Sequence, residues 1–120
     1  MCSSDLTGRE AVYRMRYNRG PTLVLQTPGF VRWLEGLHDP VAQARIASRI
    51  RRLEHGNAGD WKQLDGRIAE MRIDHGPGYR VYFARHGEAI VILLAGGDKR
   101  TQRRDLATAR RRLDELGDSP

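Results

Sequence analysis

The chain has 120 residues, of which 39% are hydrophobic and 30% charged, which predicts one globular domain and excludes a disordered chain. The 21 lysine and arginine residues exceed the 15 acidic residues, and the net charge of +6 favours an anionic partner, either nucleic acid or an acidic protein. The single cysteine excludes an internal disulfide framework, and no apolar run is long enough to cross a membrane.

Residues 1–20 are expected to lie outside the fold. Back-translated, residues 1–6 match the end of a common sequencing adapter, which indicates an artefact of gene calling. A native disordered arm is the alternative, and its arginines would contact RNA: Arg9, Arg14, Arg16 and Arg19. We therefore expect one folded domain at residues 21–116, between this extension and a disordered tail at residues 117–120.

The first half of the domain predicts a strand and two helices. Residues 22–26 are rich in β-formers and predict an edge or near-edge strand. Thr27-Pro28 and Asp39-Pro40 each predict a helix start, because the first residue can cap the helix and proline suits its first position. Apolar residues then recur at helical spacing: Phe30, Leu34 and Leu37 in the first helix, and Ile46, Ile50 and Leu53 in the second. A loop rich in glycine and aspartate is expected to hold Trp61 and Lys62.

Three antiparallel strands are predicted next. Residues 69–74 and 80–83 alternate between apolar and polar side chains, whereas residues 89–95 are apolar throughout, which predicts a central strand covered on both faces. If the polar residues of the first two strands share one face, Asp74 should oppose Arg80 and Arg72 should oppose Tyr82.

The last predicted element is a very basic helix at residues 99–116. Its apolar stripe is Leu106, Ala109, Leu113 and Leu116. Residues 99–112 hold one acid, Asp105, and seven bases: Lys99, Arg100, Arg103, Arg104, Arg110, Arg111 and Arg112. The predicted fold class is therefore α+β, with an N-terminal strand, a two-helix hairpin, a three-stranded antiparallel sheet and a basic C-terminal helix.

Several blocks between residues 23 and 115 resemble the RelE/ParE superfamily of toxins, and within it the HigB-like addiction module killer group. The blocks are residues 30–34, Met71-Arg72-Ile73-Asp74, Gly76-Pro77-Gly78-Tyr79-Arg80-Val81-Tyr82-Phe83, residues 90–94 and Gly96-Gly97-Asp98-Lys99. The resemblance implies a RelE/ParE-like fold and the toxin of a type II toxin–antitoxin module. It also implies a partner, a cognate helix-turn-helix antitoxin, with which the toxin would form a hetero-oligomer.

The activity that the resemblance implies is metal-independent cleavage of mRNA on the ribosome, with mRNA and ribosomal RNA as partners. A ParE-like inhibitor of DNA gyrase and an inactive remnant that only binds antitoxin are the alternatives. We expect no metal or organic cofactor, since the sequence has no carboxylate cluster and no phosphate-cradling loop. Because no secretory segment is present, we expect a cytoplasmic protein.

The resemblance also implies catalytic residues. Arg80 matches an arginine that contributes to cutting in RelE-like enzymes, Lys99 and Arg100 match the basic pair after the last strand, and Arg72 matches a basic strand residue. The sequence departs from RelE at Glu70 and Leu106, which stand near a lysine and a tyrosine of RelE.

The chemistry of RNA cleavage fits these residue types. The 2′-hydroxyl must lose a proton, and arginine is well suited to stabilise the charged phosphorane because its donors match phosphate oxygens. Tyr82 is expected to stack a base, and Lys62, Tyr79 and Tyr82 are candidates for the missing proton-transfer groups. The expected substrate-binding residues are Tyr82, Lys62, Arg103 and Arg104.

Overall fold

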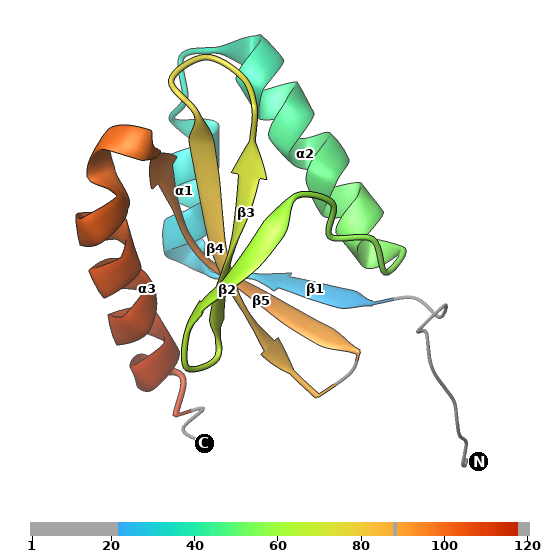
Figure 1. Ribbon diagram of the computed structural model, residues 1–120, viewed down its shortest axis with the longest axis vertical. Helices are drawn as coiled ribbons and strands as arrows, with labels where there is room; N and C mark the ends of the chain where they lie inside the picture. The colour runs from blue at the N-terminus through green and yellow to red at the C-terminus, as the bar shows by residue number, and fades with distance from the viewer. Residues whose placement is uncertain (1–21, 88, 118–120) are drawn as a thin grey trace.

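The computed structural model describes residues 22–87 and 89–117, and its elements follow the predicted α+β order (Figure 1). The extension predicted at residues 1–20 lies outside the described residues, as does the predicted tail apart from Gly117. The elements are β1 (Leu23–Gln26), α1 (Pro28–Glu35), α2 (Pro40–Glu54), β2 (Trp61–Asp65), β3 (Ile68–Ile73), β4 (Tyr79–His86), β5 (Ile90–Asp98), the 3₁₀ turn η1 (Lys99–Thr101) and α3 (Gln102–Glu115).

The sheet is larger than the predicted three-stranded one. Five strands lie in the order β1-β5-β4-β3-β2, with β1 parallel to β5 and the other pairs antiparallel. The expectation that residues 22–26 form an edge or near-edge strand is confirmed. The expectation that Trp61 and Lys62 lie in a loop was wrong, because both belong to β2, the other edge strand. Its sequence is polar and flanked by Gly59 and Gly66, so neither propensity nor alternation marks it as a strand.

Both predicted helix starts are confirmed. The Thr27 hydroxyl accepts a hydrogen bond from Phe30 N and donates one to the carbonyl of Leu93 at 2.9 Å, which ties the start of α1 to β5. The Asp39 carboxylate caps α2 by accepting hydrogen bonds from Val41 N and Ala42 N at 3.1 Å. These caps satisfy amide groups that a helix end leaves without partners.

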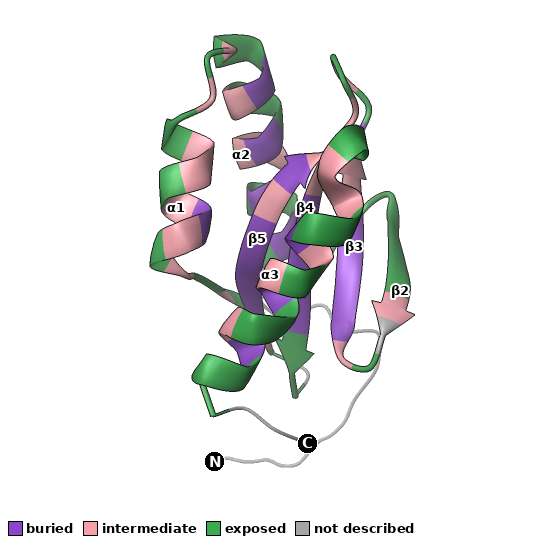
Figure 2. Cartoon of the chain, turned by 90° about the vertical axis from the view of Figure 1, so that its left-hand side faces the viewer, coloured by how far each residue is buried: buried purple, intermediate pink, exposed green. Residues whose placement is uncertain are grey.

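Helices cover the sheet on both faces, as Figure 2 shows with α3 in front of the strands and α1 and α2 at the left. On the α1–α2 side, Phe30 and Ile46 pack against Val81, Phe83 and neighbouring strand residues. On the α3 side, Ala109 and Leu113 pack against Tyr82, Ile92 and Leu94. The prediction that residues 89–95 form a strand covered on both faces is therefore confirmed.

The register of β3 and β4 differs from the prediction by two residues. Arg72 opposes Arg80, and Ile73 opposes Tyr79. Tyr82 opposes Glu70 instead of Arg72. A shift of two residues leaves every side chain on its expected face, so alternation alone does not distinguish the two registers. The turn spans residues 74–78, so Tyr79 belongs to the strand, where its ring packs against Trp33.

Gly96 and Gly97 let helices approach β5 closely from opposite faces. A Cβ at Gly96 would overlap the ring of Trp33 in α1, and a Cβ at Gly97 would overlap the carboxylate of Asp105 in α3. The side chain of Asp105 also accepts a hydrogen bond from the Thr101 hydroxyl. Gly96 therefore allows the close approach of α1, and Gly97 allows α3 to begin close against β5.

Candidate functional site

A groove of about 710 Å³ runs between β2, the adjoining strands and the first turns of η1 and α3. Its lining comes from segments far apart in the chain. The lining residues are Lys62 and Leu64 of β2, Glu70 of β3, Tyr82 of β4, Lys99 and Arg100 of η1, and Gln102, Arg103 and Leu106 of α3. Five of these residues are sequence-predicted site residues: Lys62, Tyr82, Lys99, Arg100 and Arg103.

A buried ion pair lies beneath the groove, where Glu70 forms part of the lining and binds Arg80 below it. Arg80 Nη1 donates to Glu70 Oε2 at 2.9 Å, and the two side chains are only 14% and 2% exposed. The strand register explains the position of Glu70, which lies between Lys62 of β2 and Tyr82 of β4. Because α3 covers this face of the sheet, the pair is largely withdrawn from water, where each charge depends strongly on the other.

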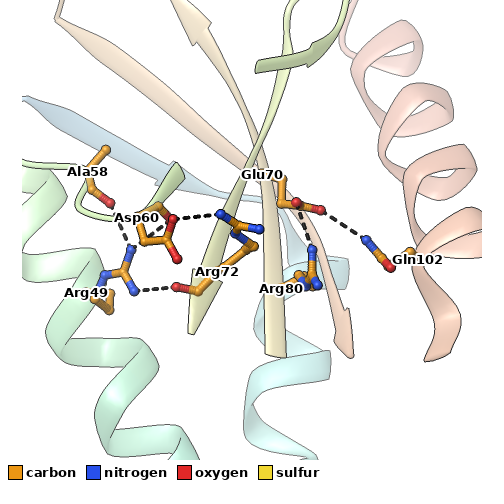
Figure 3. Close-up of polar contacts among 7 residues, drawn as sticks. All are labelled: Arg49, Ala58, Asp60, Glu70, Arg72, Arg80 and Gln102. Atoms are coloured by element: carbon orange, nitrogen blue, oxygen red, sulfur yellow. Dashed lines mark hydrogen bonds and ion pairs between the residues drawn. The ribbon is translucent and has the colours of Figure 1, made fainter. Parts of the chain in front are cut away.

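Gln102 lies over this pair at the start of α3 (Figure 3). In one amide orientation its Nε2 donates to Glu70 Oε1 at 3.4 Å. In the other, its oxygen accepts from Arg80 Nη1 at 3.1 Å and its nitrogen donates to the carbonyl of Lys99 at 3.2 Å. The second orientation gives shorter hydrogen bonds and leaves Glu70 Oε1 with no hydrogen bond among the described residues.

Tyr82 is buried beneath the groove, although the sequence suggested that it stacks a base. Its side chain is among the fully buried ones, with the residue 1% exposed, and its hydroxyl makes no hydrogen bond within residues 22–87 and 89–117. Burial, with the nearby charges of Glu70 and Asp105, raises the pKa of Tyr82 to about 12, and Arg80 and Gln102 offset this only in part. The phenol is therefore neutral at physiological pH.

Three exposed cations on the groove make no side-chain ion pair or hydrogen bond with any other part of the chain that the structure describes: Lys62, Lys99 and Arg103. Arg100 is also exposed, but its guanidinium binds Asp98 at 3.1 Å. That hydrogen bond lowers the pKa of Asp98 and raises the pKa of Arg100. The unpaired cations give the rim of the groove an excess of positive charge that suits an anionic ligand.

Three sequence-predicted residues do not line the groove: Arg80, which lies beneath it paired with Glu70, and Arg72 and Arg104, which lie outside it. Arg72 reaches away from Glu70 and binds Asp60 at 3.0 Å, next to Arg49, which clamps the 58–60 loop to β3 (Figure 3). Arg104 lies beside Asp105 at 3.6 Å and lines a different cleft, between α1 and α3. Arg72 and Arg80 are thus neighbours across two strands whose guanidinium groups bind different carboxylates, Asp60 and Glu70. Arg103 and Arg104 are adjacent in sequence but line different clefts.

Four groove residues were not among the sequence-predicted site residues: Glu70, Gln102, Leu64 and Leu106. The burial of Glu70 depends on α3 packing over the sheet, which the strand alternation does not reveal. Leu64 was missed because β2 was missed. Among residues 22–87 and 89–117, no three His, Cys, Asp or Glu side chains gather as a metal ion would require, and no helix is both long and apolar enough to cross a membrane.

A mixed five-stranded sheet with a cationic groove under its last helix defines a small basic α+β protein suited to bind a polyanion. Comparison with known proteins identifies the family. The family described as phage derived protein Gp49-like (DUF891) matches residues 32–114, and an uncharacterized protein of Haemophilus influenzae is 48% identical over 88 residues, which are 73% of this chain and 89% of that protein. The chain belongs to the Gp49-like family, a family of RelE-like toxins associated with toxin–antitoxin systems.

Replacing Tyr82 by phenylalanine tests the unpaired hydroxyl. At pH 7 we expect the free energy of unfolding to stay unchanged or to rise by about 1 kcal/mol, because a buried polar group without a partner is removed. A tyrosine whose folded pKa is raised stabilises the fold fully below pH 10 and loses that contribution as the pH rises through about 12.

The wild type should therefore lose stability more steeply than Tyr82→Phe between pH 10 and 12, measured by urea unfolding at several pH values. A loss of more than about 1 kcal/mol at pH 7 would show that the hydroxyl has a partner in the folded protein. An equally steep alkaline decline in both proteins would assign it to other groups.

Proposed function

We propose that this chain is the toxin of a type II toxin–antitoxin module, of the HigB-like kind, and that it stops translation by cutting mRNA on the ribosome. The observation that carries the proposal is the arrangement of charge in the groove. Three unpaired cations at the rim lie above a buried carboxylate that is held by a guanidinium. A site that only held phosphate would gain nothing from a carboxylate at its floor.

The carboxylate supplies the base that the cationic residues lack. Glu70 takes the proton of the ribose 2′-hydroxyl, whose oxygen then attacks the adjacent phosphorus. The bond from phosphorus to the 5′-oxygen breaks, and the leaving oxygen takes a proton from the exposed ammonium of Lys99. The products are a 2′,3′-cyclic phosphate and a 5′-hydroxyl end.

Arg80 stabilises the transition state of the cleavage more than it stabilises the ground state. Before the reaction, its charge is balanced by Glu70 at 2.9 Å. When Glu70 becomes protonated, the guanidinium loses its counter-ion at the moment when negative charge grows on the phosphorane. A cation whose charge is balanced in the ground state and released in the transition state favours the reaction.

The cations at the rim of the groove can bind either an RNA substrate or an inhibitory segment of an antitoxin. Lys62, Lys99 and Arg103 are exposed, so an RNA strand can reach them without any rearrangement of the fold. An antitoxin segment with acidic and apolar side chains would fit the same groove and exclude RNA. We propose such a segment as the means of neutralisation.

Replacing Glu70 by glutamine tests the nuclease directly. The amide keeps the shape of the side chain but accepts no proton, so we expect cleavage of mRNA to slow at least about 100-fold. The protein is induced in cells, new mRNA 5′ ends are mapped by primer extension, and cleavage is repeated with purified ribosomes. Arg45→Gln is the matched control, because Arg45 is exposed on α2, away from the groove.

Intact mRNA in growth-arrested cells would contradict the proposal. Inhibition of DNA supercoiling by the purified protein would then favour the ParE-like alternative. Absence of any growth defect would favour the inactive remnant.

Arg103 and Arg104 offer a second test, because they are adjacent in sequence and point to different grooves. Arg103→Gln should lower the affinity for single-stranded RNA and reduce the slope of log K against log salt by about 0.7, the value for one lost phosphate contact. Arg104→Gln should leave the slope unchanged. Equal effects of the two substitutions, measured by fluorescence anisotropy across a salt series, would mean that RNA does not follow the groove.

A further inference from the structure

Beneath its cationic rim, the groove also has apolar side chains in its lining. Most of its accessible wall is apolar, and Leu64 of β2 and Leu106 of α3 line it, with the ring of Tyr82 buried beneath. Both leucines are only partly buried and pack against the α3-side core. A surface that served phosphate groups alone would not need leucines in contact with water.

Each of the two leucines lies close in sequence to a groove-lining cation on the same element. On β2, Leu64 follows Lys62 by two residues, and both line the groove. On α3, Leu106 follows Arg103 by three residues, a spacing that puts both side chains on the same helix face. Each of these two walls of the groove therefore carries both a cation and an apolar side chain.

Such a pair of walls matches one nucleotide of a single strand. A base has two apolar faces, and its ribose is joined to a phosphate on each side, so an inserted base would place its phosphates near the two rims. The volume of about 710 Å³ lies within the range typical of small-molecule sites, which is about 300–1,000 Å³. A base in a duplex cannot enter, because its faces are already stacked.

We infer that the space between Leu64 and Leu106 is a slot for one unpaired nucleobase of single-stranded RNA, with the flanking phosphates on Lys62 and Arg103. The inference rests on the proposed function, because it takes RNA as the ligand, and it goes further by assigning a base-binding residue to each wall. The slot gives the groove a way to select unpaired positions in an RNA strand.

The test uses binding in place of cleavage. A short single-stranded RNA carries 2′-fluoro groups throughout, so that attack by a 2′-hydroxyl cannot occur. A series of such strands lacks one base at successive positions, and affinities are measured by fluorescence anisotropy. For the wild type, removal of the base at one position should weaken binding about tenfold, the order expected for loss of one stacked base.

Substitutions at Leu106 locate the effect. Leu106→Gln should bind the intact strand about tenfold more weakly than the wild type does and should no longer distinguish it from the abasic strand. Leu106→Met keeps an apolar wall and should retain the discrimination, which guards against a loss caused by misfolding. Leu116→Gln is the matched control, since Leu116 is 52% exposed at the other end of the same helical segment and does not line this groove.

Several outcomes would overturn the inference. The slot would be contradicted if the wild type bound the intact strand and every abasic strand with equal affinity. It would also be contradicted if Leu106→Gln still distinguished the intact strand from the abasic strands. Binding that weakens only when an apolar and acidic antitoxin peptide competes, with no preference for any base, would assign the apolar wall to the protein partner.

The experiments distinguish evidence against the base-binding slot from evidence against the nuclease activity. Base-dependent binding by a chain that cuts no mRNA would support the slot and contradict the nuclease. Cleavage of mRNA together with base-independent binding would support the nuclease and contradict the slot. Absence of binding to any strand would contradict both.

Discussion

A carboxylate and a guanidinium buried against each other under α3 are the constraint on which the rest of this structure depends. Burying Glu70 and Arg80 is tolerable only while they stay paired, since removal of one partner leaves the other charged and poorly hydrated. The β3–β4 register brings Glu70 between Lys62 and Tyr82, and Gly97 lets α3 close over the pair. A buried ion pair adds little stability compared with apolar packing, so its position at the floor of an open groove favours a chemical role.

The excess of positive charge points to a binding site only when cations paired with a carboxylate are separated from those that are not. Arg72, Arg80, Arg100 and Arg104 each lie beside a carboxylate, whereas Lys62, Lys99 and Arg103 meet none within residues 22–87 and 89–117. These three unpaired cations line the same groove, although they come from β2, η1 and α3. The net charge of +6 indicates an anionic partner, and the local pairing indicates where that partner would bind.

Local signals predicted much of the fold. The caps at Thr27 and Asp39, the apolar strand at residues 89–95 and the basic last helix were predicted because each depends on neighbours in the sequence. β2 was missed because its stability comes from pairing with β3, not from its own polar residues. The same division applies to the groove: Lys99 of η1 and Arg103 of α3 belong to the basic segment that the sequence marks, and both line the groove. Glu70 and Arg72 required the tertiary structure, because alternation assigns both to one polar face although one is buried and the other is directed to Asp60.

The central claim is that Glu70 and Arg80 act as one unit in the cleavage of RNA, and a double-mutant cycle tests it most directly. Single-turnover cleavage of mRNA on programmed ribosomes is measured for Glu70→Gln, Arg80→Gln and the double variant, with circular dichroism confirming that each is folded. If the pair is one unit, each single variant loses at least about 100-fold, and the double variant loses little more than the worse single variant. Losses that multiply in the double variant, or single variants that cut at the wild-type rate, would contradict this account.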